Sequence, residues 1–128
     1  MIDNETKAAL EAIGCTVELC GSRVTCSVVP ETSDWDYRVE IPDDERIYEQ
    51  TLDALPDEWV MEGGEHYDKG IRYTFHSFRR GNVNLLVSMN AAWCERHRVA
   101  THICRQLDIL HKPNRIMVFQ AVLYGNME

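Results

Sequence analysis

The sequence predicts an α+β domain of mixed α/β type, in which helices cover a small sheet and two helices end the chain. Segments with helical spacing of apolar residues alternate with short runs of strand-like pattern. The chain has 128 residues, 45% of them apolar, which is enough for one core. No repeat or linker-like stretch interrupts it, so we expect a single domain over residues 1–128.

The first elements are expected to be a helix and a short strand. Residues 4–14 predict the helix, with Asn4 as its N-cap and Gly14 as its end. Residues 15–20 predict the strand, which runs into a glycine turn.

A second strand and a second helix are expected next. Residues 34–41 alternate polar and apolar side chains, the period of a half-buried strand. A helix is expected over residues 42–55, with Pro42 at its start and acidic residues in its first turn.

The second half predicts a hairpin followed by two helices. Two strand-like runs, 73–80 and 82–89, flank a turn around Gly81. Helices are expected over residues 91–110 and 114–125. The first of these helices is expected to bury one face, made of Trp93, Ala100, Ile103, Leu107 and Leu110.

The net charge of −8 is unevenly divided along the chain. Residues 1–68 hold 18 acidic and four basic residues, whereas residues 69–128 hold nine basic and three acidic ones. This division indicates either solvated surfaces that partly pair, which charge alone favours, or a cleft with an acidic and a basic wall. No run of Lys and Arg marks a surface for duplex nucleic acid.

The cysteines and the hydropathy indicate a reduced, cytoplasmic protein. None of the five cysteines forms a Cys-x-x-Cys pair, so we expect free, mostly buried thiols. No stretch approaches the ~20 apolar residues that cross a bilayer, so no membrane partner is expected.

Two acidic residues, Asp34 and Asp36, are separated by one residue in the expected strand. Side chains at such positions point to the same face, so the two carboxylates would repel each other. A divalent cation relieves this repulsion, and Mg²⁺ prefers one or two carboxylates together with phosphate oxygens. The turn at Gly21 and Ser22 would offer backbone N–H groups and a hydroxyl to a phosphate. Each element alone is common without a function, and their ordered combination is the more specific signal.

The stretch GSRVTCSVVPETSDWD resembles the motif of nucleotidyltransferase domains of the DNA polymerase β superfamily. With GSRVTC, DWDY, NLL and RIMVFQAVLYG, nearly the whole chain is similar to small nucleotidyltransferase-like proteins of bacteriophages. The resemblance implies a nucleotidyltransferase-like fold that binds a nucleoside triphosphate with Mg²⁺ or Mn²⁺. It also implies transfer of a nucleoside monophosphate to an acceptor, which is RNA, a protein or a small molecule.

The resemblance also implies roles for individual residues. Gly21, Ser22 and Arg23 would hold the triphosphate, and Asp34 and Asp36 would hold the metal. If so, Asp34 and Asp36 should converge on one cleft with the strand of residues 82–89, and Ser22 should face that cleft.

One position departs from the superfamily pattern, which has a third acid in the later strand. The matching residue here is Asn84, which brings no charge and cannot act as a base. Two hypotheses follow. In the first, the chain is an enzyme of weak or specialised activity, with Asp34, Asp36 and Asn84 as its catalytic positions. In the second, it is a binding protein without turnover that acts on a host protein in the host cytoplasm.

Overall fold

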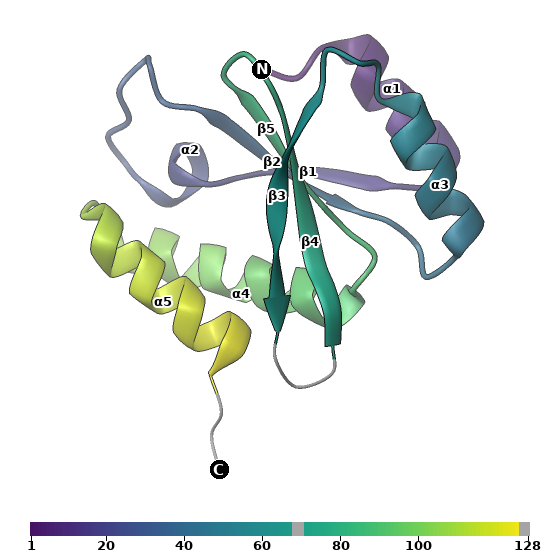
Figure 1. Cartoon of the computed structure of the whole chain (residues 1–128). Coiled ribbons are helices and arrows are strands. Elements are labelled where there is room, and N and C mark those ends of the chain that lie inside the picture. The colour runs from purple at the N-terminus through teal and green to yellow at the C-terminus, as the bar shows by residue number, and fades with distance from the viewer. Residues whose placement is uncertain (68–70, 126–128) are drawn as a thin grey trace.

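The computed structural model describes residues 1–67 and 71–125 (Figure 1). Its elements, in chain order, are α1 (Asn4–Ile13), β1 (Thr16–Cys20), α2 (Ser22–Thr25), β2 (Trp35–Glu40), α3 (Glu45–Ala54), β3 (Val60–Tyr67), β4 (Ile71–Arg80), β5 (Val83–Ser88), α4 (Ala91–Leu107) and α5 (Lys112–Tyr124).

The strands form one five-stranded mixed sheet in the order β1-β2-β5-β4-β3. Strands β2 and β5 are parallel, and the other neighbouring pairs are antiparallel. The predicted α+β class, with its small mixed sheet and C-terminal helical pair, is therefore confirmed. The hairpin expected around Gly81 is also confirmed, as β4 and β5.

Helices cover both faces of the sheet, with α1 and α3 on one face and α4 and α5 on the other (Figure 1). The first face holds the larger apolar core, whose fully buried members are Leu10, Val39, Ile41, Leu85 and Val87. The second face holds a smaller cluster around Trp93, Cys94 and Leu123, with Phe75, Leu86 and Phe119 packed against it.

The expectation of a half-buried strand over residues 34–41 is wrong. Strand β2 lies between β1 and β5 with helices on both faces, so both sets of its alternating side chains are covered. Val39 is fully buried on one face, and Arg38 is only 2% exposed on the other. This charged side chain is therefore a buried arginine that pairs with the partly exposed Glu18, and not a solvent-facing position.

The helix starts lie close to the predicted ones but use different caps. Asp3, rather than Asn4, caps α1, because its carboxylate accepts a hydrogen bond from the Thr6 N–H. Helix α1 ends at Gly14 as predicted, in the left-handed conformation that glycine favours. Helix α3 begins after the cap Asp44 rather than at Pro42.

Two elements, α2 and β3, were not predicted. In α4 the buried face also differs from the predicted one, because Leu107 is 67% exposed at the helix end and Leu110 lies beyond it. The face that packs on the sheet is instead made of Trp93, Cys94, His97, Ala100, Thr101 and Cys104.

The thiols follow the sequence prediction. All five cysteines are free, and all except the partly exposed Cys26 are buried. In the described part of the chain, no helix has the length and apolar character needed to cross a membrane.

Candidate functional site

The turn after β1 lies directly against a carboxylate of β2. Gly21 has a φ of 72°, in the left-handed region that favours glycine. A Cβ atom at this position would lie 2.3 Å from Oδ2 of Asp36. Both the backbone conformation and the close approach therefore require glycine at this turn.

The two residues after Gly21 have different surroundings. Ser22 begins the short helix α2 and lines a cleft together with Gly21. Arg23 donates hydrogen bonds to the carbonyl oxygens of Glu31, at 2.9 Å, and Ser33, at 2.7 Å. Its guanidinium also lies 3.9 Å from the centre of the Trp35 ring. Arg23 thus holds the loop that precedes β2.

Asp36 is held by the strand beside it. The parallel register places it opposite Asn84, whose Nδ2 donates a hydrogen bond of 3.3 Å to Oδ1 of Asp36. Burial raises the pKa of Asp36, and the charge of Asp34 adds to the rise. The Asn84 hydrogen bond and the charges of Arg79 and Lys112 oppose it.

Asn84 is itself fixed from the other side. Its Oδ1 accepts a hydrogen bond of 2.7 Å from the Ser77 hydroxyl of β4. With this bond in place, its carbonyl oxygen is directed to Ser77 and its amide N–H to Asp36. In this arrangement Asn84 positions the carboxylate of Asp36.

Asp34 precedes β2 and lies in an ion pair. Its Oδ2 is 3.1 Å from Nη1 of Arg79, whose Nε is 3.0 Å from Oε1 of Glu62. The Asp34 side chain is 47% exposed, so it is the more accessible of the two carboxylates. One guanidinium therefore lies between Asp34 and the acid of β3.

The cleft itself has a volume of about 750 Å³. Asp34 and Asp36 line one side of it, and Lys112 and Arg115 of α5 line another. Acidic and basic side chains therefore line one cleft, although Arg115 also donates to the carbonyl oxygens of Ile109 and Leu110. Pairing between the acidic and the basic half is present as well, as in the ion pairs of Arg80 with Asp3 and of Arg98 with Glu18.

Aromatic side chains line the part of the cleft between the sheet and the C-terminal helices. Phe75 stacks on Trp93 with ring centroids 4.9 Å apart. His97 follows at 4.9 Å from Trp93, and Phe119 meets His97 edge-on at 5.0 Å. The cleft thus joins a charged region to an aromatic one.

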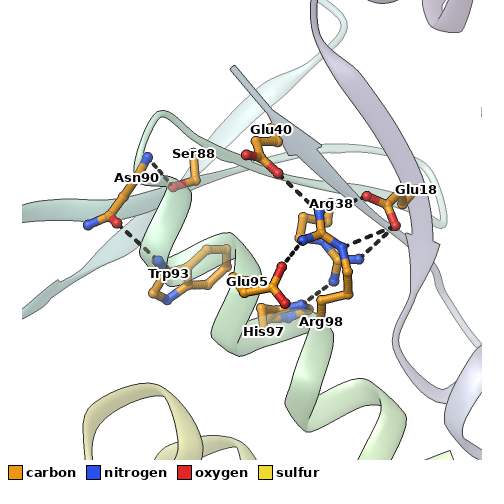
Figure 2. Close-up of polar contacts among 9 residues, drawn as sticks. All are labelled: Glu18, Arg38, Glu40, Ser88, Asn90, Trp93, Glu95, His97 and Arg98. Carbon is orange, nitrogen blue, oxygen red and sulfur yellow. Dashed lines mark hydrogen bonds and ion pairs between the residues drawn. The ribbon is translucent and has the colours of Figure 1, made fainter. Parts of the chain in front are cut away.

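An ion network around the buried Arg38 contacts one ring nitrogen of His97 (Figure 2). Nη1 of Arg38 is 2.8 Å from Nδ1 of His97, and Nη2 donates to Glu18 at 3.1 Å. Arg98 binds the same Glu18 at 2.9 Å and Glu40 at 3.0 Å. Because a guanidinium only donates, Nδ1 of His97 accepts, and the ring proton of the neutral imidazole is on Nε2.

His97 is neutral over the physiological pH range. Burial, followed by the charges of Arg38 and Arg98, lowers its pKa to about 3. His97 therefore lines the cleft as an uncharged hydrogen-bond donor.

The residues available for a divalent cation are Asp34 and Asp36. Within residues 1–67 and 71–125, no group of three or more His, Cys, Asp or Glu side chains could hold a metal ion. Two carboxylates suit an ion that brings further oxygen ligands from a phosphate, as Mg²⁺ does. The pair therefore fits one ion that completes its coordination with water or with phosphate oxygens.

Most of the residues expected from the sequence meet at this cleft. Gly21, Ser22, Asp34 and Asp36 line it, and Asn84 contacts Asp36 from the neighbouring strand. Arg23 is directed into the loop instead.

Sequence reasoning gave too little weight to Arg79, Lys112 and His97. The ion pairs of Arg79 depend on the fold of the loop before β2 and of β3, which its local sequence does not indicate. The basic residues of α5 carried no motif, and only the packing of α5 brings them opposite the acids. His97 lies four residues after Trp93 on the same helix face, which was the available signal.

The sequence matches no protein-family model and no curated protein. Two solved structures are similar in backbone arrangement. One is a chain of the GLD-2/RNP-8 complex, with 13% identity and a TM-score of 0.47, over 89% of this chain and 42% of that one. The other is Cid1, described for its RNA terminal uridylyl transferase activity, with 16% identity and a TM-score of 0.46, over 94% and 41%. The chain thus spans less than half the length of either.

Proposed function

We propose that the chain is a nucleotidyltransferase-like protein that binds a nucleoside triphosphate together with Mg²⁺ or Mn²⁺ in this cleft. The carrying observation is the contact between Asp36 and the Gly21 turn, at a cleft whose other wall holds Lys112 and Arg115. Carboxylates for a cation, a serine turn for phosphate and basic side chains for further phosphate oxygens line one space.

Each residue has a stated part in the proposal. Asp34 and Asp36 hold the cation, and Asn84 orients Asp36. Ser22 and the backbone of Gly21 hold the triphosphate, and Arg23 supports the loop that carries Asp34. The acceptor is RNA, a host protein or a small molecule, and the whole of residues 1–128 acts as one domain in the cytoplasm.

The proposed reaction is transfer of a nucleoside monophosphate. A bond forms between an acceptor oxygen and the α-phosphorus, the bond to the leaving pyrophosphate breaks, and the acceptor proton passes to solvent. A bound divalent ion would neutralise the phosphates and polarise the reacting phosphorus. The chain's own residues hold the ion and the phosphates in place. His97, with its pKa lowered to about 3, is not the base that takes the acceptor proton.

A second candidate, a binding protein without turnover, is favoured by one observation. Asn84 stands where the resemblance places a third acid, and its carbonyl oxygen accepts from Ser77. Such a site would bind the ligand without activating the acceptor. The partner would then be a host protein.

A transfer assay separates the two candidates. The protein is incubated with each labelled triphosphate and Mg²⁺ or Mn²⁺, with total cell RNA and protein as acceptors. If the chain is an enzyme, a labelled product is expected from wild type and from the surface control Asp43→Asn, and none from Asp36→Asn. The binding-protein hypothesis is favoured if wild type labels no acceptor. It also requires that a complex with a host protein still forms in the variant Asp34→Asn/Asp36→Asn.

A further inference from the structure

A row of three side chains crosses the sheet beside the cleft. The register places Asp36 of β2 opposite Asn84 of β5, and Asn84 opposite Arg79 of β4. Residues opposite each other on adjacent strands project from the same face. The row therefore runs from a carboxylate through an amide to a guanidinium.

The amide in the middle makes a hydrogen bond on each side and brings no charge. Its oxygen accepts from Ser77 at 2.7 Å, and its N–H donates to Asp36 at 3.3 Å. Turning the amide would replace its hydrogen bond to Asp36 by two acceptor oxygens facing each other, whereas the Ser77 hydroxyl could accept from the turned N–H. The site thus has two carboxylates and no third anionic ligand among its described residues.

The guanidinium at the end of the row is held on two sides. Nη1 of Arg79 lies 3.1 Å from Asp34, and Nε lies 3.0 Å from Glu62. Glu62 orients the planar guanidinium so that its other edge faces Asp34. A permanent positive charge is therefore already present beside the two carboxylates.

We infer that Arg79 takes the place of a second cation, so that this site binds a single divalent ion. The inference rests on the proposed function, because it concerns the cation expected at Asp34 and Asp36. A second divalent ion would need a further anionic ligand and would be repelled by the guanidinium. The charge of Arg79 and the absence of a third carboxylate at Asn84 together limit the site to one ion.

Mn²⁺ alone, titrated against the intact protein and counted by electron paramagnetic resonance, tests this inference. Wild type is expected to bind one ion. Arg79→Gln removes the competing charge and should bind one ion about tenfold more tightly, as expected for a unit charge a few ångströms from a divalent ion. Arg79→Lys keeps the charge and should resemble wild type.

The neighbouring arginine provides a matched control. Arg80 lies on the opposite face of the sheet, where it pairs with Asp3 and lies 4.8 Å from the Trp59 ring. Arg80→Gln changes the net charge equally and should leave Mn²⁺ binding unchanged. Arg79→Gln/Asn84→Asp removes the guanidinium and adds a carboxylate, and it should bind two ions. Melting curves establish that each variant is folded.

The outcomes separate the inference from the proposed function. Two ions bound by wild type, or equal affinity in wild type and Arg79→Gln, would overturn the inference and leave the cation site in place. No Mn²⁺ bound by wild type or by any folded variant would overturn the cation site as well.

Discussion

The two faces of the sheet differ in what they bury. The face under α1 and α3 buries apolar side chains such as Leu10, Val39 and Leu85. The face under α4 and α5 buries Arg38 and His97, and it borders an open cleft. Apolar burial is favourable by itself, whereas buried charged and polar groups must find partners. The face under α1 and α3 therefore contributes more to stability, and the face under α4 and α5 borders the candidate site.

The strongest test of this difference compares two adjacent leucines of β5. Leu85 is fully buried under α1 and α3, and Leu86 lines the cleft. Leu85→Ala should lower the free energy of unfolding by about 2–5 kcal/mol, since it leaves a cavity in a packed core. Leu86→Ala should cost clearly less because its site is partly open. Urea unfolding measures both, and an equal loss would contradict the division between the faces.

A smaller effect is expected at the glycine turn. Gly21 and Gly81 both have positive φ, but only a Cβ at Gly21 would meet Asp36. Each change to alanine should cost roughly 1–3 kcal/mol from backbone strain. Gly21→Ala should cost more than Gly81→Ala and should alone perturb the NMR signals of Asp36. Equal costs with no such perturbation would mean that the contact does not constrain the turn.

The cleft face should also make stability depend on pH. In the folded chain the pKa of His97 is lowered to about 3, whereas in the unfolded chain it has its usual value of about 6.5. Between pH 6.5 and pH 3 the unfolded chain therefore binds one more proton than the folded chain. The stability contribution is full above pH 6.5 and is lost as pH falls toward 3.

The titration of His97 adds at most about 1.4 kcal/mol per pH unit to the slope of the unfolding free energy against pH. His97→Gln should flatten the slope between pH 6 and 4, and the exposed control His102→Gln should not. An unchanged slope in His97→Gln would show that folding does not lower the pKa of His97.

The smallest effect is expected at Asp36 without metal. Because burial raises its pKa, the charged carboxylate destabilises the folded state at neutral pH. Asp36→Asn should therefore melt at an equal or higher temperature in a chelator, while the exposed control Asp43→Asn should be neutral. A lower melting temperature for Asp36→Asn would indicate that the charge is already compensated.

The local patterns predicted most of the fold and part of the site. The turn at Gly21 and the acids at Asp34 and Asp36 could be read directly, because each depends on neighbouring residues. The burial of Arg38 could not be read from the sequence, because it depends on a hydrogen bond to the ring nitrogen Nδ1 of His97, which lies on a distant helix. Arg79 was missed as a site residue for the same reason, because its partners come from two other segments.

The central claim is that Asp34 and Asp36 bind a triphosphate through a divalent cation. Calorimetric titration with a nucleoside triphosphate, with and without Mg²⁺, tests it most directly. The proposal predicts binding only with Mg²⁺, because the carboxylates repel bare phosphates, and a loss of at least about tenfold in Asp34→Asn/Asp36→Asn. Equal triphosphate affinity in wild type and the double variant with Mg²⁺ would contradict it.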